Sequence, residues 1–309
     1  PLIQAQMIET MLLVTINHQS LIATKTSRIV RAAQGRPVFE FGSRRAQGYD
    51  AAALGARAAY IAGAGGTSCT ICGQHFGVPL IGTMAHSWVQ VFDSEYEAFS
   101  AYARSYPDQS VLLVDTYNVL KSGVPNAIRT AREILEPRGH RLRGIRIDSG
   151  DLTYLTVKAR EMLDQAGLHD CRITVSNALD EYIIRDLIQQ GAAIDAFGVG
   201  ERLITSRAEP VFGGVYKLAA IEQDGRIQPR MKFSENAGKI TNPGNKEVWR
   251  FYDRSTGKAI ADLISLADET IDPSEPYELF DPLHTWKRKV VTDFTARRLL
   301  EPIFAKGKL

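Results

Sequence analysis

Two aspartates follow short apolar segments and could bind a cation or a phosphate-bearing ligand. Asp115 follows residues 111–114, and Asp148 follows residues 144–147. Mg²⁺ prefers carboxylate oxygens and commonly shares its coordination sphere with substrate phosphates. Alternatively, each carboxylate caps the helix that follows it, since Asp148-Ser149-Gly150-Asp151 also suits a helix N-terminus. The sequence leaves both interpretations open.

An arginine stands next to the second aspartate. Arg146 lies two residues before Asp148, so both side chains project from the same face of one strand. A buried arginine is costly unless it pairs with a carboxylate or binds an anion. A simple buried ion pair and an anion site both meet this requirement.

A glycine pair and a histidine are further candidates. Gly198-Val199-Gly200 follows an apolar segment, and its backbone N–H groups could hold a phosphate. His86 could be a general base, a nucleophile or a hydrogen-bonded core residue. We do not expect Ser87 to form a nucleophile pair with it in an extended segment, because neighbouring side chains point apart.

The cysteines indicate packing more than chemistry. Cys69 and Cys72 form a single Cys-x-x-Cys pair, whereas zinc needs two further ligands at suitable spacing, so ordinary helix packing is favoured over a zinc site or a redox pair. The third cysteine, Cys171, is distant in sequence. Three cysteines make no disulfide framework, which favours a reducing compartment, the cytoplasm.

Alternating strands and helices must position these residues. Predicted strands cover residues 38–41, 79–82, 111–114, 144–147, 172–175 and 195–198, and predicted helices cover 49–62, 95–106, 126–136, 154–166 and 181–190. The strand segments are nearly continuous in apolar residues, as expected when helices cover both faces. This rhythm predicts a parallel α/β sheet, open or closed, with its functional site at the carboxyl ends of the strands.

Polar and glycine residues follow every predicted strand. They are Gly42 to Arg45, Thr83 to His86, Asp115 to Tyr117, Asp148 to Asp151, Ser176 with Asn177, and Val199 with Gly200. Because the carboxyl ends of parallel strands share one edge, we expect a single composite site there.

The two ends of the chain differ from this rhythm. Residues 1–34 read as one or two helices, and residues 4–19 are apolar on more than one face, which predicts burial between layers. After Glu209 we expect more antiparallel strands, at residues 211–220, 246–252 and 259–266, with a turn at 253–257. The chain starts at Pro1 without an initiator Met, so we expect N-terminal material to be missing.

Composition excludes several classes of protein. The 309 residues are 44% hydrophobic, and 37 Lys and Arg against 35 Asp and Glu give a net charge of +2. This balance argues against a protein that coats nucleic acid or an anionic membrane. Apolar segments fall far short of the ~18–20 residues of a membrane-spanning helix. We therefore expect neither nucleic acid nor a membrane as partner.

Six motifs in one order resemble the nicotinate phosphoribosyltransferase family. They are Phe41-Gly42-Ser43-Arg44-Arg45, Gly65-Gly66-Thr67-Ser68, Gly82-Thr83-Met84-Ala85-His86-Ser87, Arg146-Ile147-Asp148-Ser149-Gly150-Asp151-Leu152, Phe197-Gly198-Val199-Gly200 and Gly213-Gly214-Val215-Tyr216-Lys217-Leu218. The resemblance implies a type II phosphoribosyltransferase fold: an irregular, TIM-like parallel α/β barrel joined to an α/β sandwich. The barrel would span residues 36–209. Residues 1–35 would add a helical segment to the sandwich, and residues 210–309 would return to it with strands and helices.

The resemblance also implies a reaction. The family transfers the phosphoribosyl group of phosphoribosyl pyrophosphate (PRPP) to nicotinate, giving nicotinate mononucleotide and pyrophosphate in NAD biosynthesis (salvage). ATP hydrolysis is coupled to this transfer through a phosphohistidine, and Mg²⁺ is the implied cofactor. The partners implied are nicotinate, PRPP, ATP and a second copy of the chain, in a homodimer with a shared active site.

The implied site residues fall into four groups. His86, as the phosphohistidine, and Asp148 are catalytic; Phe41, Ser68, Thr83 and Arg146 bind nicotinate, with Phe41 as an aromatic platform; Arg44, Asp115, Ser149, Asn177, Gly198, Gly200 and Glu201 bind PRPP; Asp148 and Asp115 hold Mg²⁺. Two features depart from the family pattern: no family Tyr that stacks on the pyridine ring precedes Pro1, and Glu201 stands where many relatives have Thr.

Ser68 bears on the choice of substrate. Related nicotinamide phosphoribosyltransferases place an Asp at this position, where it accepts from the amide. An Asp would repel a carboxylate substrate by about 4 kcal/mol at 4 Å and a dielectric of 20, roughly a thousandfold. Ser68 has no such penalty, so we expect the acid to be favoured over the amide. Two alternatives remain: another Mg²⁺-dependent barrel enzyme acting on a phosphorylated sugar, and a truncated PRPP-binding protein without turnover.

Overall fold

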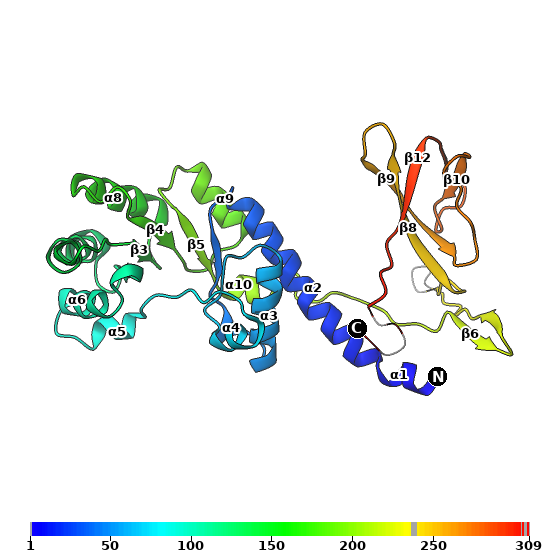
Figure 1. Cartoon of the computed structure of the whole chain (residues 1–309), viewed down its shortest axis with the longest axis horizontal. Coiled ribbons are helices and arrows are strands. Elements are labelled where there is room, and N and C mark those ends of the chain that lie inside the picture. Colours follow the sequence, from blue (N-terminus) through cyan, green and yellow to red (C-terminus); the bar gives the residue numbers. More distant parts are fainter. Residues whose placement is uncertain (1, 236–239, 304, 306–307, 309) are drawn as a thin grey trace. The chain divides into compact units, whose positions relative to one another are not determined.

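The computed structural model describes residues 2–235, 240–303, 305 and 308 (Figure 1). The chain divides into two compact units, Pro1–Gly214 and Val215–Leu309. Each unit has a hydrophobic core of its own.

A parallel sheet is the centre of the first unit. Its strands are β1 (Val38–Glu40), β2 (Val111–Leu113), β3 (Gly144–Ile147), β4 (Arg172–Val175) and β5 (Ala196–Val199). They lie in the order β1-β5-β4-β3-β2, and every pairing is parallel. The predicted α/β class is confirmed. Ile145, Ile147, Ile173 and Val175 are fully buried, which explains their continuous apolar pattern.

Single backbone bridges extend the sheet beyond β1. Glu40 pairs with Thr67, and Thr67 pairs with Leu80. The strand predicted at residues 79–82 is thus reduced to one bridge. The other end of the sheet meets this segment again at the carboxyl ends of the strands. There Thr83 and His86, which follow Leu80, contact Arg146 on β3 and Asp115 after β2. The result is an irregular barrel.

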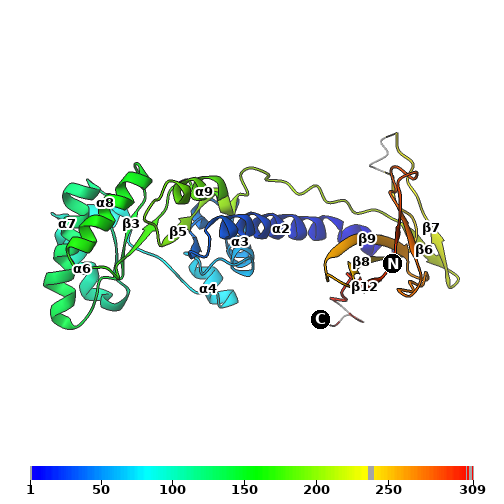
Figure 2. The ribbon, with the colours of Figure 1, turned by 90° about the horizontal axis from the view of Figure 1, so that it is seen from above.

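Helices connect the strands of the barrel (Figures 1 and 2). They are η1 (Ser43–Arg45), α3 (Tyr49–Ile61), α4 (Thr70–Phe76), α5 (His86–Gln90), α6 (Glu95–Ser105), η2 (Pro107–Gln109), η3 (Val119–Gly123), α7 (Val124–Thr130), η4 (Ala131–Leu135), η5 (Glu136–Arg138), α8 (Leu152–Gln165), α9 (Glu181–Gln189) and α10 (Glu201–Ile204). Asp151, not Asp148, caps α8 by accepting from the Tyr154 N–H at 3.1 Å. Asp148 is therefore left to other contacts.

Two helices, α1 (Leu2–Met7) and α2 (Glu9–Ala32), open the chain as predicted. Figures 1 and 2 show α3 beside α2. The C-terminal half of α2 is buried at Ile22 and Ile29. The prediction that residues 4–19 are buried is wrong, because Met7 and Met11 are 73% and 71% exposed. Within the first unit, only the later turns of α2 pack against α3 and α9.

The second unit consists of antiparallel strands. They are β6 (Ala220–Gln223), β7 (Arg226–Pro229), β8 (Lys246–Asp253), β9 (Ala259–Leu266), β10 (Tyr277–Phe280), β11 (Arg288–Val291) and β12 (Phe294–Arg298). Phe251 and Phe294 stack at 4.4 Å in its core. The strands predicted at residues 246–252 and 259–266 are confirmed.

Two expectations for the C-terminal part are wrong. The strand predicted at residues 211–220 is not formed, and regular structure begins only at Ala220. Val211 and Phe212 are exposed, and no strand pairs with residues 211–218 among the described residues, so their backbone has no ladder to join. Pairing starts where the Ala219 carbonyl accepts from the Arg230 N–H and Ala220 pairs with Pro229 of β7. We also expected helices here, whereas residues 215–235 and 240–303 contain strands and no helix.

Candidate active site

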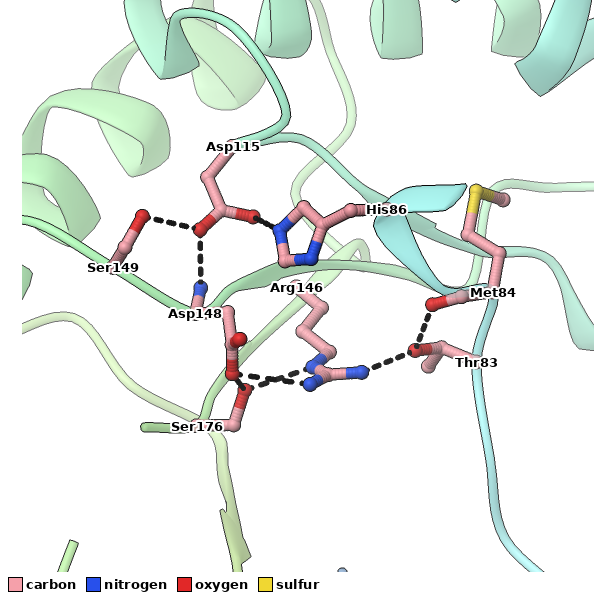
Figure 3. Close-up of polar contacts among 8 residues, drawn as sticks. All are labelled: Thr83, Met84, His86, Asp115, Arg146, Asp148, Ser149 and Ser176. Carbon is pink, nitrogen blue, oxygen red and sulfur yellow. Dashed lines mark hydrogen bonds and ion pairs between the residues drawn. The ribbon is translucent and has the colours of Figure 1, made fainter. Parts of the chain in front are cut away.

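The guanidinium of Arg146 connects three strand ends (Figure 3). Arg146, on β3, donates from Nη1 to Thr83 Oγ1 at 2.9 Å and from Nε to Ser176 Oγ at 2.8 Å. Nη2 donates to Asp148 Oδ1 at 3.1 Å. Thr83 follows the bridge at Leu80, and Ser176 follows β4. These bonds fix the orientation of a largely buried positive charge at the rim.

Asp148 is held from two sides. Its Oδ1 accepts from Arg146 and from the hydroxyl of Ser176, which is buried. The ion pair considered from the sequence is thus present. Within the described ranges the side-chain hydrogen bonds of Asp148 use Oδ1, which leaves Oδ2 for a ligand in the adjoining cavity.

Asp115 joins the histidine to the β3 loop (Figure 3). Its Oδ1 is 3.0 Å from His86 Nε2, and its Oδ2 accepts from the Asp148 N–H at 3.0 Å and from Ser149 Oγ at 2.6 Å. The Asp115 side chain is only 2% exposed, and that of His86 is 41% exposed. A carboxylate can only accept, so this contact suits the tautomer of His86 with its proton on Nε2, which has a lone pair on Nδ1.

A cavity of about 190 Å³ opens next to this network. Its lining residues are Phe41, Arg44, Arg45, Arg146, Asp148, Ser176, Asn177, Ala178, Gly198, Gly200, Glu201 and Arg202. Eight of them are sequence-predicted site residues: Phe41, Arg44, Arg146, Asp148, Asn177, Gly198, Gly200 and Glu201. The carboxyl ends of several strands therefore contribute to one cavity, as the sequence rhythm predicts.

Five predicted residues lie outside the cavity lining. Thr83, His86, Asp115 and Ser149 are linked to it through the hydrogen bonds of Figure 3. Ser68 is exposed, and its backbone N–H donates to the Glu40 carbonyl at 2.9 Å. Its proposed role in substrate choice stays a prediction.

The ring of Phe41 rests on a glycine. A Cβ at Gly198 would lie 2.5 Å from two ring carbons of Phe41, so any larger residue would displace the ring. The Arg146 Cζ atom lies 5.4 Å from the ring centroid. An aromatic acid stacked on Phe41 would therefore have a cation close to its carboxylate.

Two arginines of the cavity received no role from the sequence: Arg45 stands in the first motif without an assignment, and Arg202 was not named. Arg45 lies 3.8 Å from Glu201, and Glu201 also lies 3.3 Å from Arg207. Arg202 pairs with Asp180, the N-cap of α9. Burial would raise the pKa of Asp180, but the Ile183 N–H and the Arg202 guanidinium outweigh it and lower the pKa. The signal available for Arg202 was a basic residue just after the Gly-x-Gly sequence.

The two predicted metal ligands are not equivalent. Asp148 borders the cavity and has Oδ2 available, whereas both oxygens of the buried Asp115 already accept hydrogen bonds. The described residues contain no group of three or more His, Cys, Asp or Glu side chains that could hold a metal. Mg²⁺ usually keeps waters and substrate phosphate oxygens around one or two carboxylates. Asp148 suits such a site as the carboxylate that would bind Mg²⁺ directly. Asp115 would support the site indirectly, because it holds the backbone N–H of Asp148.

The cysteines lie away from this network. Cys69 and Cys72 pack with Ala52, Ala56 and Val78 in a small apolar cluster. Burial raises the pKa of Cys72 to about 11, so its thiolate is scarce at neutral pH. Packing is the role their surroundings support. Among the described residues, no helix combines the length and apolar character needed to span a bilayer.

The parallel strands, the irregular closure and the cavity define an α/β-barrel protein with a candidate ligand site at the carboxyl ends of the strands. The profile of the nicotinate phosphoribosyltransferase (NAPRTase) family matches residues 37–239, and that of the nicotinate phosphoribosyltransferase C-terminal domain matches residues 245–309. The chain belongs to the nicotinate phosphoribosyltransferase family, and the resemblance seen in its motifs is confirmed.

Individual relatives agree with this assignment. The chain is 48% identical to a nicotinate phosphoribosyltransferase of Bacillus subtilis over 311 aligned residues, covering 100% of this chain and 62% of that protein. It is 43% identical to the Mycobacterium tuberculosis nicotinate phosphoribosyltransferase pncB2, covering 94% of this chain and 59% of the relative. The crystal structure of human nicotinic acid phosphoribosyltransferase superposes with a TM-score of 0.85 at 28% identity, covering 100% of this chain and 68% of that one. The chain thus spans about three fifths of the curated relatives' length.

Proposed function

We propose that this protein transfers the phosphoribosyl group of PRPP to nicotinate, releasing nicotinate mononucleotide and pyrophosphate, in the salvage of pyridine for NAD. The observation that carries the proposal is the cavity in which Phe41 rests on Gly198 beneath the guanidinium of Arg146. It offers a flat apolar surface and a fixed cation together, which suit an aromatic carboxylate. Family membership supports the same reaction.

The residues of the cavity divide the work. Phe41 and Arg146 orient nicotinate so that its ring nitrogen can attack C1 of the ribosyl group, while the C1–O bond to pyrophosphate breaks. Arg44, Arg45 and Arg202 place positive charge where the phosphates of PRPP would lie. The backbone around Gly198, Gly200 and Asn177 holds the 5′-phosphate. Mg²⁺, when bound at Asp148, would neutralise negative charge on the departing pyrophosphate.

The Asp115–His86 pair suits the coupled use of ATP. Because Asp115 accepts from Nε2–H, the free lone pair on Nδ1 is the nucleophile that takes the terminal phosphoryl group, with ADP as the leaving group. Asp115 also holds the Asp148 N–H and the Ser149 hydroxyl. A phosphate on His86 would add negative charge to this network and so change how it holds PRPP.

Product analysis tests the proposal. The protein is incubated with nicotinate, PRPP and Mg²⁺, with and without ATP, and the products are identified by mass spectrometry beside a nicotinamide control. We expect nicotinate mononucleotide, more of it with ATP, and little amide product. Binding of PRPP without pyrophosphate release, or turnover that ignores nicotinate, would overturn it. We further propose a homodimer with a shared site, located in the cytoplasm, which sedimentation and fractionation can check.

A further inference from the structure

Glu40 is a buried carboxyl group at the carboxyl end of β1. It is 0% exposed, and no Lys, Arg or His side chain forms an ion pair with it within the described ranges. Burial raises the pKa of Glu40, although hydrogen bonds from Thr67 and Gly42 act in the opposite direction. A buried carboxyl group is costly, and packing alone does not require one.

The two oxygens of Glu40 bind two different loops. Oε1 accepts from the backbone N–H of Gly42, and Oε2 accepts from Thr67 Oγ1 at 2.5 Å. Thr67 Oγ1 in turn accepts from the Cys69 N–H at 2.9 Å. One side chain therefore connects the loop after β1 to the loop around Ser68.

Each of these loops carries a residue assigned to nicotinate. Gly42 directly follows Phe41, the proposed aromatic platform, and Thr67 directly precedes Ser68. The backbone repeats the connection, since the Glu40 carbonyl accepts from the Ser68 N–H at 2.9 Å. The distance between the platform and the serine is thus set through Glu40.

We propose that Glu40 is a positioning residue for substrate selection, which fixes the Ser68 loop relative to the Phe41 platform so that the site accepts nicotinate over nicotinamide. This inference rests on the proposed function. Glutamate suits the role because both partners present a hydrogen: the Gly42 N–H can only donate, and the Thr67 hydroxyl already accepts from Cys69.

Two test substitutions and one matched control separate this role from packing. Thr67→Val keeps the shape of the side chain but removes the hydroxyl, and Thr67→Ser keeps the hydroxyl as a matched control. Glu40→Gln keeps an acceptor for Gly42 but presents an NH₂ group to Thr67. Steady-state kinetics with nicotinate and nicotinamide are measured together with thermal melting and amide hydrogen exchange of residues 41–45 and 67–69.

We expect Thr67→Val to raise the KM for nicotinate about tenfold and to narrow the preference for the acid, with kcat changed less, as expected for one lost hydrogen bond. Amide hydrogen exchange should become faster in both loops, residues 41–45 and 67–69, whereas Thr67→Ser should resemble the wild-type protein. Glu40→Gln should likewise raise the KM for nicotinate, narrow the preference for the acid and speed amide hydrogen exchange. This variant serves as the test if Thr67→Val does not fold.

A purely structural role gives a different result. Lower melting temperatures with unchanged KM and preference, or faster exchange in the mutated loop alone, would overturn the inference. If the wild-type protein makes no nicotinate mononucleotide, the proposed function fails. The hydrogen-exchange comparison still decides whether Glu40 couples the two loops.

Discussion

At the scale of the residue, the site is organised by side chains that use several atoms at once. Arg146 bonds to Thr83, Ser176 and Asp148 through three different nitrogens, and Asp115 receives three donors. Such networks orient charge more strictly than single pairs do, because moving one member breaks several hydrogen bonds.

Ser176 gives the first prediction. Its hydroxyl accepts from Arg146 Nε and donates to Asp148. Ser176→Ala leaves both groups short of a partner in a nearly buried place, so we expect the KM for nicotinate to rise about tenfold and stability to fall by about 1–2 kcal/mol. Initial rates and urea unfolding check this. Ser105→Ala, on the exposed face of α6, is the matched control, and equal behaviour of the two variants would contradict the role of Ser176.

Residue types at strand ends could be predicted from the sequence, and their partners could not. Asp148 and Arg146 were found because Arg146 lies within an apolar strand and Asp148, two positions later, directly follows it. Ser176 was named only as a strand-end residue without a role, and Arg202 was not named, because their roles depend on neighbours brought together by β4, β5 and α9. Glu40 was missed altogether, since only the fold shows that Gly42 and Thr67 face its carboxyl group.

At the scale of the element, the sequence predicts a short strand correctly where the strand is buried along its whole length. The prediction fails where the segment is partly exposed. β3 and β4 are predicted with their observed bounds because helices cover both faces. Leu80, in the segment predicted as a strand at residues 79–82, is 54% exposed, and that segment forms one bridge. The apolar start of α2 is largely exposed, with Met11 and Val14 at 71% and 61%, which the apolar pattern alone does not reveal.

A buried ion pair fastens α2 to α9. Lys25 Nζ lies 2.6 Å from Glu181 Oε2, and the two side chains are 5% and 11% exposed. Lys25→Met leaves a buried carboxylate without its partner, so we expect a loss of about 3–5 kcal/mol in the stability of the first unit. Adding Glu181→Leu to Lys25→Met should restore much of the lost stability, because the unpaired carboxylate is then removed. Denaturant melts of the single and double variants form the test, and an unchanged midpoint in Lys25→Met would refute the importance of the pair.

The turn between β8 and β9 predicts a pH dependence. Hydrogen bonds from the Ser255 and Thr256 hydroxyls and from the Thr256 N–H lower the pKa of Asp253 to about 2. Because the folded pKa lies below the ordinary value of 3.8, this stabilisation is present above pH about 4 and is lost as the pH falls towards 2. Hydrogen exchange of β8 and β9 from pH 5 to 2 should show this loss, and Asp253→Asn should flatten it. The same pH dependence of hydrogen exchange in the wild type and in Asp253→Asn would contradict the role of Asp253 in stabilising the turn.

At the scale of the whole molecule, two units with separate cores share one chain. The segment at residues 211–219 has no regular structure, and Phe212 and Tyr216 within it are 53% and 38% exposed. Exposed, irregular backbone is where proteases cut first. We expect limited chymotrypsin digestion to cleave at these two residues before any site within β1 to β5, with fragments identified by mass spectrometry. First cleavage within the parallel sheet would show that the units are not independently stable.

The irregular barrel has one joint that differs from the others. β1 to β5 are joined to their neighbours by backbone ladders, whereas the segment after Leu80 reaches β2 and β3 through Thr83–Arg146 and His86–Asp115. Side-chain bonds can be exchanged without unfolding any strand. In the reaction we propose, a phosphate on His86 would place negative charge beside Asp115, so the use of ATP would weaken one of the two side-chain contacts that close the barrel.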